Sequence, residues 1–260
     1  MCIKLLISPI SVEEARVVAS AGCDLIDIKN VAEGSLGAQP PWVIKQIVSE
    51  LSGTGATFSV ALGDLPNKPG TAGLAAYGAA QLGVGYIKAG LYGATNYDEA
   101  LAVMSAVVRS IRLVSGDILA VASGYADYKR FGGVSCDELV AASAKAGADV
   151  VMVDTAIKDG MNLFDALTLE EIKDFIDAGH DAGMKVALAG SIGLDHVDAL
   201  CELAPDIIGV RGAVCDGLNR KNRIIGEKVA RLYSYVRSHA VPDKAFAVCG
   251  GAGLPLNPVI

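Results

Sequence analysis

Short apolar runs alternate with helical patterns along most of this 260-residue chain. Each run is rich in Val, Ile, Leu and Ala, which is typical of buried parallel strands. The predicted strands cover residues 4–9, 25–30, 56–62, 85–91, 117–124, 149–156, 184–191 and 206–213. The predicted helices cover residues 12–21, 42–51, 71–82, 97–111, 136–146, 169–181, 194–203 and 222–238. Eight alternating units of strand and helix predict an α/β fold, a (β/α)8 TIM barrel.

The length of the chain suits a single domain, because α/β barrels commonly run to about 250 residues without dividing. We expect the barrel domain at residues 1–239. After His239 the composition changes to Gly, Pro and small residues without a period, so residues 240–260 are predicted to be a C-terminal tail. Such a tail either packs on the barrel or on a neighbouring subunit, or is a disordered end.

Charge and cysteine usage limit the class of partner. The net charge of −7 and the pI of about 5.0 argue against nucleic acid or an anionic membrane as the main partner. Polar residues interrupt every apolar run before a spanning length of about 20 residues, so no membrane helix is expected. The six cysteines have no C-x-x-C spacing and no signal peptide precedes them, which indicates reduced thiols in a cytoplasmic protein.

Lys29 follows an apolar strand and shares one strand face with Asp27, because side chains repeat every second residue. Desolvation and a neighbouring cation lower the pKa of such a lysine, and only the neutral amine attacks a carbonyl. The pattern therefore predicts a Schiff-base nucleophile. The alternative is an ordinary lysine at a strand end whose ammonium group reaches into water. Lys88, inside the strand at 85–91, is the second candidate for the nucleophile.

Charged residues gather where the predicted strands end, and barrel enzymes have their active sites at the carboxyl ends of the strands. These residues are Asp27, Lys29, Asp64, Lys68, Lys88, Asp127, Asp154, Lys158 and Arg211. Such a mixture of cations and carboxylates can keep one lysine neutral among charged neighbours. Lys68 and Asp127 are included as candidate substrate-binding residues.

A phosphate site is predicted after the seventh and eighth strands. Gly190 and Ser191 follow one strand, and Arg211 and Gly212 follow the next, so backbone N–H groups and a cation meet where barrels often bind phosphate. The alternative is that both glycines serve only tight turns. The glycine-rich loop at 34–37 is a weaker candidate for a second anion site.

Metal and cofactor chemistry find little support in the sequence. The three histidines, His180, His196 and His239, fall in helical segments, which we expect to lie away from the strand exits. The chain has no G-x-S-x-G elbow, and no dinucleotide-binding fingerprint follows its first strand. We therefore expect neither a metal nor a cofactor.

Several of these stretches together are characteristic of one family. They are Ile26–Asn30, Glu33–Ala38, Lys68–Thr71, Tyr86–Gly93, Gly124–Asp127, Asp154–Gly160, Ala187–Ser191 and Gly209–Cys215. On these residues the chain resembles the (5-formylfuran-3-yl)methyl phosphate synthases. These barrel enzymes make the furan precursor of methanofuran from glyceraldehyde 3-phosphate. The tail after His239 is longer than is usual for archaeal members, which suggests a bacterial methylotroph version with a role in one-carbon metabolism.

The resemblance implies a lyase that acts on phosphates and condenses two triose phosphates with release of one phosphate. It implies that Lys29 is the Schiff-base lysine and Lys88 the proton acceptor. Asp27, Asp154 and Lys158 are implied as supporting site residues, and a homo-oligomer is expected. Two alternatives remain. One is a different class I aldolase of phosphorylated sugars, and the other is a barrel that binds sugar phosphates without catalysis.

Overall fold

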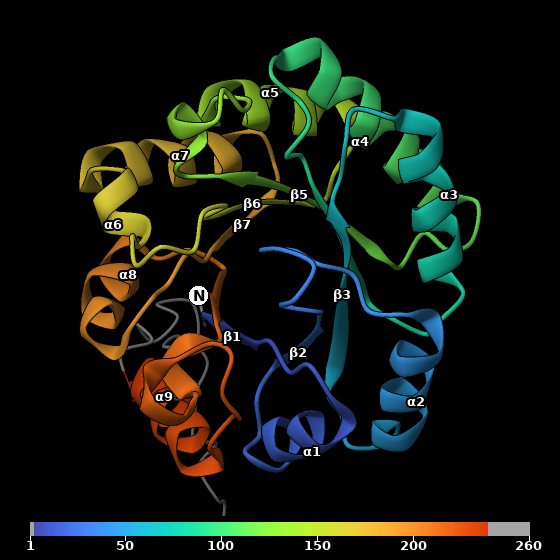
Figure 1. Cartoon of the computed structure of the whole chain (residues 1–260). Coiled ribbons are helices and arrows are strands. Elements are labelled where there is room, and N and C mark those ends of the chain that lie inside the picture. The colour runs from blue at the N-terminus through green and yellow to red at the C-terminus, as the bar shows by residue number, and fades with distance from the viewer. Residues whose placement is uncertain (1–2, 239–260) are drawn as a thin grey trace, which may run out of the picture.

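Eight parallel strands close into a barrel in the order β1 to β8, and helices surround the barrel (Figure 1). The computed structural model describes residues 3–238. The strands are β1 (Lys4–Ile7), β2 (Leu25–Ile28), β3 (Thr57–Asp64), β4 (Tyr86–Gly90), β5 (Leu119–Tyr125), β6 (Val150–Asp154), β7 (Lys185–Leu188) and β8 (Ile207–Val210). The predicted (β/α)8 barrel is confirmed, and each strand pairs with the next along the chain.

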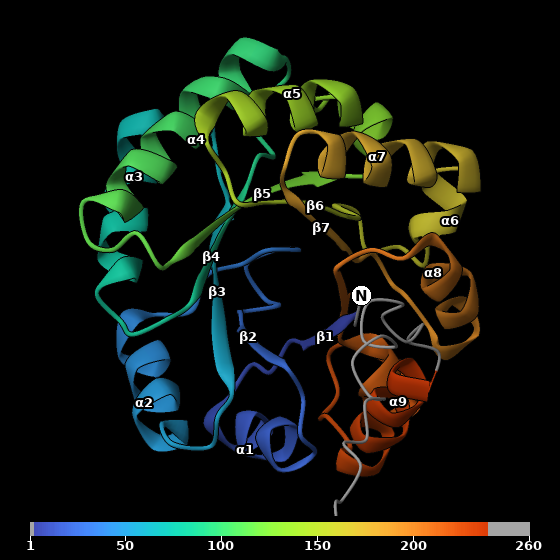
Figure 2. The same ribbon diagram turned by 180° about the vertical axis from the view of Figure 1, so that it is seen from behind.

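The helices form the outer ring of the barrel, as both Figure 1 and Figure 2 show. The α-helices are α1 (Val12–Ser20), α2 (Pro41–Leu51), α3 (Pro69–Ala80), α4 (Tyr97–Arg112), α5 (Cys136–Ala146), α6 (Leu163–Ala166), α7 (Leu169–Asp181), α8 (Val197–Leu203) and α9 (Gly226–Ser238). The short 3-10 helices are η1 (Tyr128–Arg130), η2 (Leu194–His196), η3 (Gly212–Val214) and η4 (Asp216–Leu218). No helix between residues 3 and 238 is both long enough and apolar enough to cross a bilayer.

Local sequence explains where many helices begin. The Ser11 side chain accepts the Glu14 N–H group at the start of α1, and Ser135 and Glu138 form a capping box at α5. Helix α2 begins with Pro41, whose missing N–H group costs nothing at that position. These residues fix where the loops that connect strands to helices end.

The barrel has two apolar layers. The larger one lies between the strands and the surrounding helices. A smaller cluster fills the barrel interior from alternate strand positions, and its members are Leu6, Leu25, Tyr86, Val121, Val150, Met152, Ala187, Ala189 and Ile207. Strand β8 pairs with β1 through Lys4 and Ile207, which closes the barrel. This interior cluster lies beneath the buried polar residues at the carboxyl ends of the strands.

Most predicted helices end within two residues of the observed bounds, and three differences are larger. The expected helix at 194–203 is a 3-10 turn followed by α8, and the short helix α6 was not predicted. The last helix begins at Gly226 instead of residue 222, because the Ile224 N–H group donates to Glu14 and Ile224 bridges to Cys215. These contacts draw the backbone away from helical geometry. The predicted tail at 240–260, and its boundary after residue 239, lie outside the described residues.

Candidate active site

A cavity of about 550 Å³ opens at the carboxyl ends of the strands. Eight of the predicted site residues line it, namely Asp27, Lys29, Asp154, Lys158, Gly190, Ser191, Arg211 and Gly212. Strands β1, β2, β6, β7 and β8, with the loops that follow them, provide its walls. The fold therefore gathers in one place charged residues that lie up to nearly two hundred positions apart, as expected for the active-site end of a barrel.

Lys29 comes directly after β2 and is only 8% exposed. Burial lowers the pKa of Lys29 to about 8, opposed by the Asp154 carboxylate and assisted by the Lys88 ammonium group. No hydrogen bond within residues 3–238 stabilises the charged form of this amine. Lys29 is therefore a lysine whose neutral form is accessible near neutral pH and whose amine faces the cavity.

Lys88 lies deeper in the barrel than Lys29 and does not line the cavity. The Lys88 Nζ atom donates to Asp27 Oδ2 over 2.6 Å, and the two residues are 1% and 0% exposed. Lys88 reaches from β4 to β2 past β3, whose residues Ser59 and Ala61 are small enough to leave room. The Ser8 hydroxyl donates to the same Asp27 oxygen over 2.9 Å. Asp27 Oδ1 is buried without a hydrogen-bond partner in the described part of the chain.

Asp154 and Lys158 form the second pair of the site. The Lys158 ammonium group donates to Asp154 Oδ1 over 2.7 Å and to the Thr155 hydroxyl over 2.9 Å. Burial by itself would raise the pKa of Asp154, but the cations of Lys158 and Lys29 and the Thr155 N–H bond outweigh it and hold that pKa well below its usual range. Asp154 is therefore an ionised carboxylate beside Lys29.

Arg211 lines the cavity, yet each of its guanidinium nitrogens already donates to the protein. Nη1 bonds to Ser8 O over 2.6 Å and to Glu14 Oε2 over 2.8 Å. Nε bonds to Arg220 O, and Nη2 bonds to Glu14 and to Asn222 O. The buried pair of Arg211 and Glu14 thus ties β8 to α1. The direct phosphate contact predicted for Arg211 would require these bonds to break.

Arg220 lines the same cavity and was not predicted as a site residue. Its Nη2 atom donates to Gly34 O over 3.2 Å. Burial lowers the pKa of Arg220, and the nearby Arg211 cation adds to this effect while Asp154 opposes it. Arg220 lies in the irregular segment between η4 and α9, where no periodic pattern marks a residue as inward-facing. The one feature of the sequence that could have indicated Arg220 is its position as a basic residue in the loop after the last strand.

The loops after β7 and β8 line the cavity. Gly190 and Ser191 have positive φ angles of 117° and 50°, and a Cβ atom on Gly190 would come within 3.1 Å of Thr155 Cγ2. The N–H groups of Ser191, Ile192, Gly212 and Ala213 have no acceptor among residues 3–238. Unpartnered N–H groups at the edge of a cavity are suited to bind an anion.

His196 also lines the cavity, so the expectation that every histidine lies away from the strand exits was wrong for this residue. The predicted helix begins as the 3-10 turn η2, which brings His196 to the cavity rim. The Gly193 N–H group donates to His196 Nδ1 over 3.0 Å. In the described part of the chain, no group of three or more His, Cys, Asp or Glu residues is placed to hold a metal.

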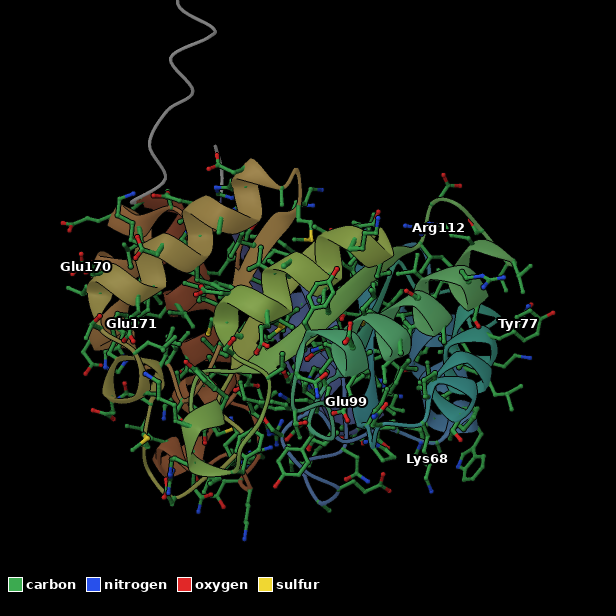
Figure 3. All side chains as sticks on the ribbon, turned by 90° about the horizontal axis from the view of Figure 1, so that it is seen from above. Lys68, Tyr77, Glu99, Arg112, Glu170 and Glu171 are labelled. Carbon is green, nitrogen blue, oxygen red and sulfur yellow. The ribbon has the colours of Figure 1, made fainter. Side chains whose placement is uncertain are left out.

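The structure does not bring Lys68 or Asp127 into the cavity. The Asp127 carboxylate is buried and accepts the N–H groups of Ala156 (2.7 Å) and Ile157 (3.0 Å), which shapes the loop after β6. Lys68 is exposed just before α3, and Figure 3 labels it below Tyr77, which lies further along that helix. A role for either residue in substrate binding stays a prediction.

The glycine-rich loop at 34–37 lies over the barrel, between β2 and α2 in Figure 1. Its Ser35 and Leu36 N–H groups donate to the Asp64 carboxylate over 2.9 and 3.3 Å. The Ser35 hydroxyl donates to Thr155 O across the mouth over 2.8 Å. The suggested second anion site therefore already binds a carboxylate of its own chain, so these N–H groups are not available to a second phosphate.

Comparisons with known proteins place these features in context. The sequence model of a family described as 4-HFC-P synthase matches residues 5–233. The chain is 50% identical over 233 residues to the (5-formylfuran-3-yl)methyl phosphate synthase of Archaeoglobus fulgidus, covering 90% of this chain and 99% of that protein. It is 48% identical to the enzyme of the same name from Methanothermobacter thermautotrophicus, covering 87% and 95%. Both relatives are archaeal, so they do not support the bacterial source suggested by the tail.

Solved structures resemble the chain in fold. KGPDC from Streptococcus mutans has a TM-score of 0.62 at 12% identity, with 91% of this chain and 98% of that chain covered. The 3-hexulose-6-phosphate synthase of Salmonella typhimurium has a TM-score of 0.60 at 16% identity, with 90% and 100% covered. At these identities the likeness concerns the barrel and not the chemistry.

Proposed function

The chain belongs to the 4-HFC-P synthase family, and from this premise we propose that it is an enzyme that makes (5-formylfuran-3-yl)methyl phosphate for methanofuran biosynthesis. The proposed substrates are two molecules of glyceraldehyde 3-phosphate, and the atoms balance when one phosphate and two water molecules leave. The observation that carries the proposal is Lys29, whose pKa burial lowers to about 8 within a cavity lined by carboxylates.

In the proposed first step, the neutral amine of Lys29 attacks the carbonyl carbon of one triose phosphate. The resulting carbinolamine loses water and becomes an iminium ion. The iminium withdraws electrons and so acidifies the adjacent C–H bond. Asp154, an ionised carboxylate beside Lys29, favours the cationic iminium over the neutral amine.

Proton removal is proposed to involve Asp27 and Lys88 together. Asp27 lines the cavity, whereas Lys88 lies beneath it and contacts Asp27 over 2.6 Å. A proton taken from the substrate therefore goes to the Asp27 carboxylate, which the Lys88 ammonium group holds in place through Oδ2. This arrangement supports Lys29 as the nucleophile. The proton-accepting role that the family resemblance implies for Lys88 falls to Asp27 in this proposal, and Lys88 stabilises that carboxylate. The unpartnered Asp27 Oδ1 atom is the oxygen that remains able to accept the proton.

The carbanion equivalent then adds to the aldehyde of the second triose phosphate. Loss of one phosphate, ring closure and dehydration produce the aromatic furan. Asp154 and Lys158 are held together by a hydrogen bond of 2.7 Å at the cavity wall, and we assign them the proton transfers of the dehydrations. We assign one phosphate to the N–H groups near Gly190, Ser191 and Gly212, residues that line the same cavity as Lys29.

The test is to follow both products at once. Purified protein is mixed with glyceraldehyde 3-phosphate, and furan absorbance and released inorganic phosphate are measured over time. The proposal expects one phosphate for each furan formed. Release of no phosphate together with formation of a simple aldol would identify a different Schiff-base aldolase. No product of either kind would contradict an enzymatic role with this substrate.

A further inference from the structure

The cations that line the cavity differ in what they contact. Lys158 is bonded to Asp154, and Arg211 is bonded to Glu14. Lys88, just below the cavity, is bonded to Asp27. Lys29 and Arg220 differ from these cations, because neither forms an ion pair with a carboxylate of residues 3–238, and of the two only Arg220 is a guanidinium group, which stays charged. Asp154 and Asp64 act on Arg220 only at longer range, so this half-buried guanidinium group has no anion in direct contact.

Arg220 is also held in place by the protein. The Arg211 Nε atom donates to the carbonyl oxygen of Arg220 over 2.6 Å, and Nη2 donates to Asn222 O over 3.2 Å. The buried pair of Arg211 and Glu14 therefore fixes the backbone at Arg220 and two residues after it. Because the backbone is fixed, little conformational freedom of the loop remains to be lost when the side chain binds a ligand.

The same cavity contains unpartnered hydrogen-bond donors of a second kind. The N–H groups of Ser191 and Ile192 come from the loop after β7, and those of Gly212 and Ala213 from the loop after β8. Within the described chain none of the four has an acceptor. Arg220, with a single hydrogen bond to Gly34 O, adds a guanidinium group with unused N–H donors.

We propose that Arg220 is the cation of a phosphate-binding subsite, which it forms with the backbone N–H groups of the loops after β7 and β8. The ligand is the phosphoryl group of a small phosphorylated aldehyde or alcohol. A planar guanidinium group can bind two phosphate oxygens at once, and the phosphate dianion supplies the negative charge that this cation lacks. Arg211 acts only through position, because it holds the Arg220 backbone. The subsite rests on the proposed function only for the identity of the substrate.

The subsite also explains how the aldehyde is oriented. Arg220 connects the loop after β8 to Gly34, in the loop that follows Lys29 and its strand. A phosphate held by Arg220 and by the loop after β7 lies in the cavity that Lys29 also lines. The carbonyl end of a three-carbon substrate then extends toward Lys29. Arg220 is thus a positioning residue for the proposed Schiff base.

The test uses sn-glycerol 3-phosphate, which carries the phosphate but has no carbonyl and cannot form a Schiff base. Its binding is measured by calorimetry for the wild type, Arg220→Gln, Arg220→Lys and Arg223→Gln. Arg223 lies in the same loop, is exposed and does not line the cavity, so its variant removes the same charge elsewhere. We expect Arg220→Gln to weaken binding roughly ten- to hundredfold, Arg220→Lys to recover part of the loss, and Arg223→Gln to change it less than about twofold.

The subsite is refuted if the wild type does not bind sn-glycerol 3-phosphate, if Arg220→Gln binds it as tightly as the wild type, or if Arg223→Gln weakens binding equally. A second readout separates positioning from a structural role. Borohydride trapping of glyceraldehyde 3-phosphate should need a roughly tenfold higher substrate concentration in Arg220→Gln, while trapping of unphosphorylated glyceraldehyde stays unchanged. Equal loss with both aldehydes would contradict a phosphate contact. A wild type that binds sn-glycerol 3-phosphate but forms no adduct would leave the subsite standing and overturn the proposed function.

Discussion

The two sides of the barrel mouth use similar carboxylates for different purposes. On the side of β3 to β5, Asp64 and Asp127 accept backbone N–H groups and hold loops in place. On the side of β6 to β8 and β1 to β2, Asp27 and Asp154 accept lysine ammonium groups and line an open cavity. A carboxylate at a strand end is therefore not by itself a sign of catalysis. The group bonded to the carboxylate is more informative, because a backbone N–H group cannot take up or release a proton as a lysine can.

The two sides of the mouth also differ in how tightly their side chains pack. Leu36, Ala61 and Tyr125 form a buried apolar cluster on the first side, and Phe131 packs against it. Tyr92 stacks on the Phe131 ring at a centroid distance of 4.7 Å. Burial and the neighbouring Asp64 carboxylate raise the pKa of Tyr125 well above its usual value, so this phenol is a hydrogen-bond donor and not a base. We call this packed side of the mouth the filled side, and the side that contains the cavity the open side.

The largest effect is expected from Lys29→Arg on the open side. Arginine keeps the positive charge but supplies no neutral amine near neutral pH, so the rate of furan formation should fall by roughly 10⁴-fold or more. Binding of sn-glycerol 3-phosphate should change little, because the proposed phosphate subsite does not include Lys29. The exposed Lys45→Arg serves as the matched control. A Lys29→Arg protein that still forms furan at a comparable rate would show that another residue is the nucleophile.

The next largest effect is expected when the support of the phosphate loop is broken. Arg211→Met leaves the Glu14 carboxylate buried without its partner, so the free energy of unfolding in urea should fall by about 3–5 kcal/mol. Arg16→Met breaks an ion pair with Glu50 on the surface and should have little effect. If Arg211→Met is as stable as the wild type but no longer binds sn-glycerol 3-phosphate, then Arg211 contacts the phosphate directly, as the sequence first predicted.

A smaller loss is expected on the filled side. Asp64→Ala removes the acceptor of the Ser35 and Leu36 N–H groups and of the Tyr125 hydroxyl. The free energy of unfolding should fall by roughly 2–3 kcal/mol, because these donors lose a charged acceptor. The exposed Asp117→Ala is the control and should unfold like the wild type. An Asp64→Ala protein of unchanged stability would mean that the loop does not depend on this carboxylate.

The last prediction concerns pH. The pKa of Lys29 is about 8, so its amine is mostly protonated below that pH and mostly neutral above it. The rate of adduct formation should therefore rise about tenfold for each pH unit from pH 6 toward pH 8 and then level off. Asp154→Asn removes the carboxylate that raises this pKa, so the plateau should begin at a lower pH. A plateau that begins near the ordinary lysine value would contradict the desolvation of Lys29.

The sequence predicted the barrel well because its signal is local. Each strand shows as a short apolar run and each helix as a period, and parallel strands of a barrel deliver their carboxyl ends to one face. Strand parity was also sufficient to place Asp27 and Lys29 on the same wall of the cavity. The depth of Lys88 could not be predicted, because it depends on the small residues of β3 and on a bond to Asp27, which lies on another strand.

Residues in irregular loops escaped prediction for a similar reason. Arg220 reaches the cavity because Arg211 and Glu14 hold its loop, and those two residues lie at opposite ends of the chain. His196 reaches it because a predicted helix starts as a 3-10 turn. Neither arrangement leaves a periodic trace in the sequence. The homo-oligomer, the cytoplasmic location and the bacterial methylotroph source stay predictions.

The most direct test of the account is borohydride reduction of the protein with glyceraldehyde 3-phosphate, followed by mass spectrometry of its peptides. The account expects a single reduced adduct on the peptide that contains Lys29, and none in Lys29→Arg. An adduct on Lys88 in the wild type would contradict it, because Lys88 lies below the cavity in a bond with Asp27. The roles assigned to the two lysines would then have to be exchanged.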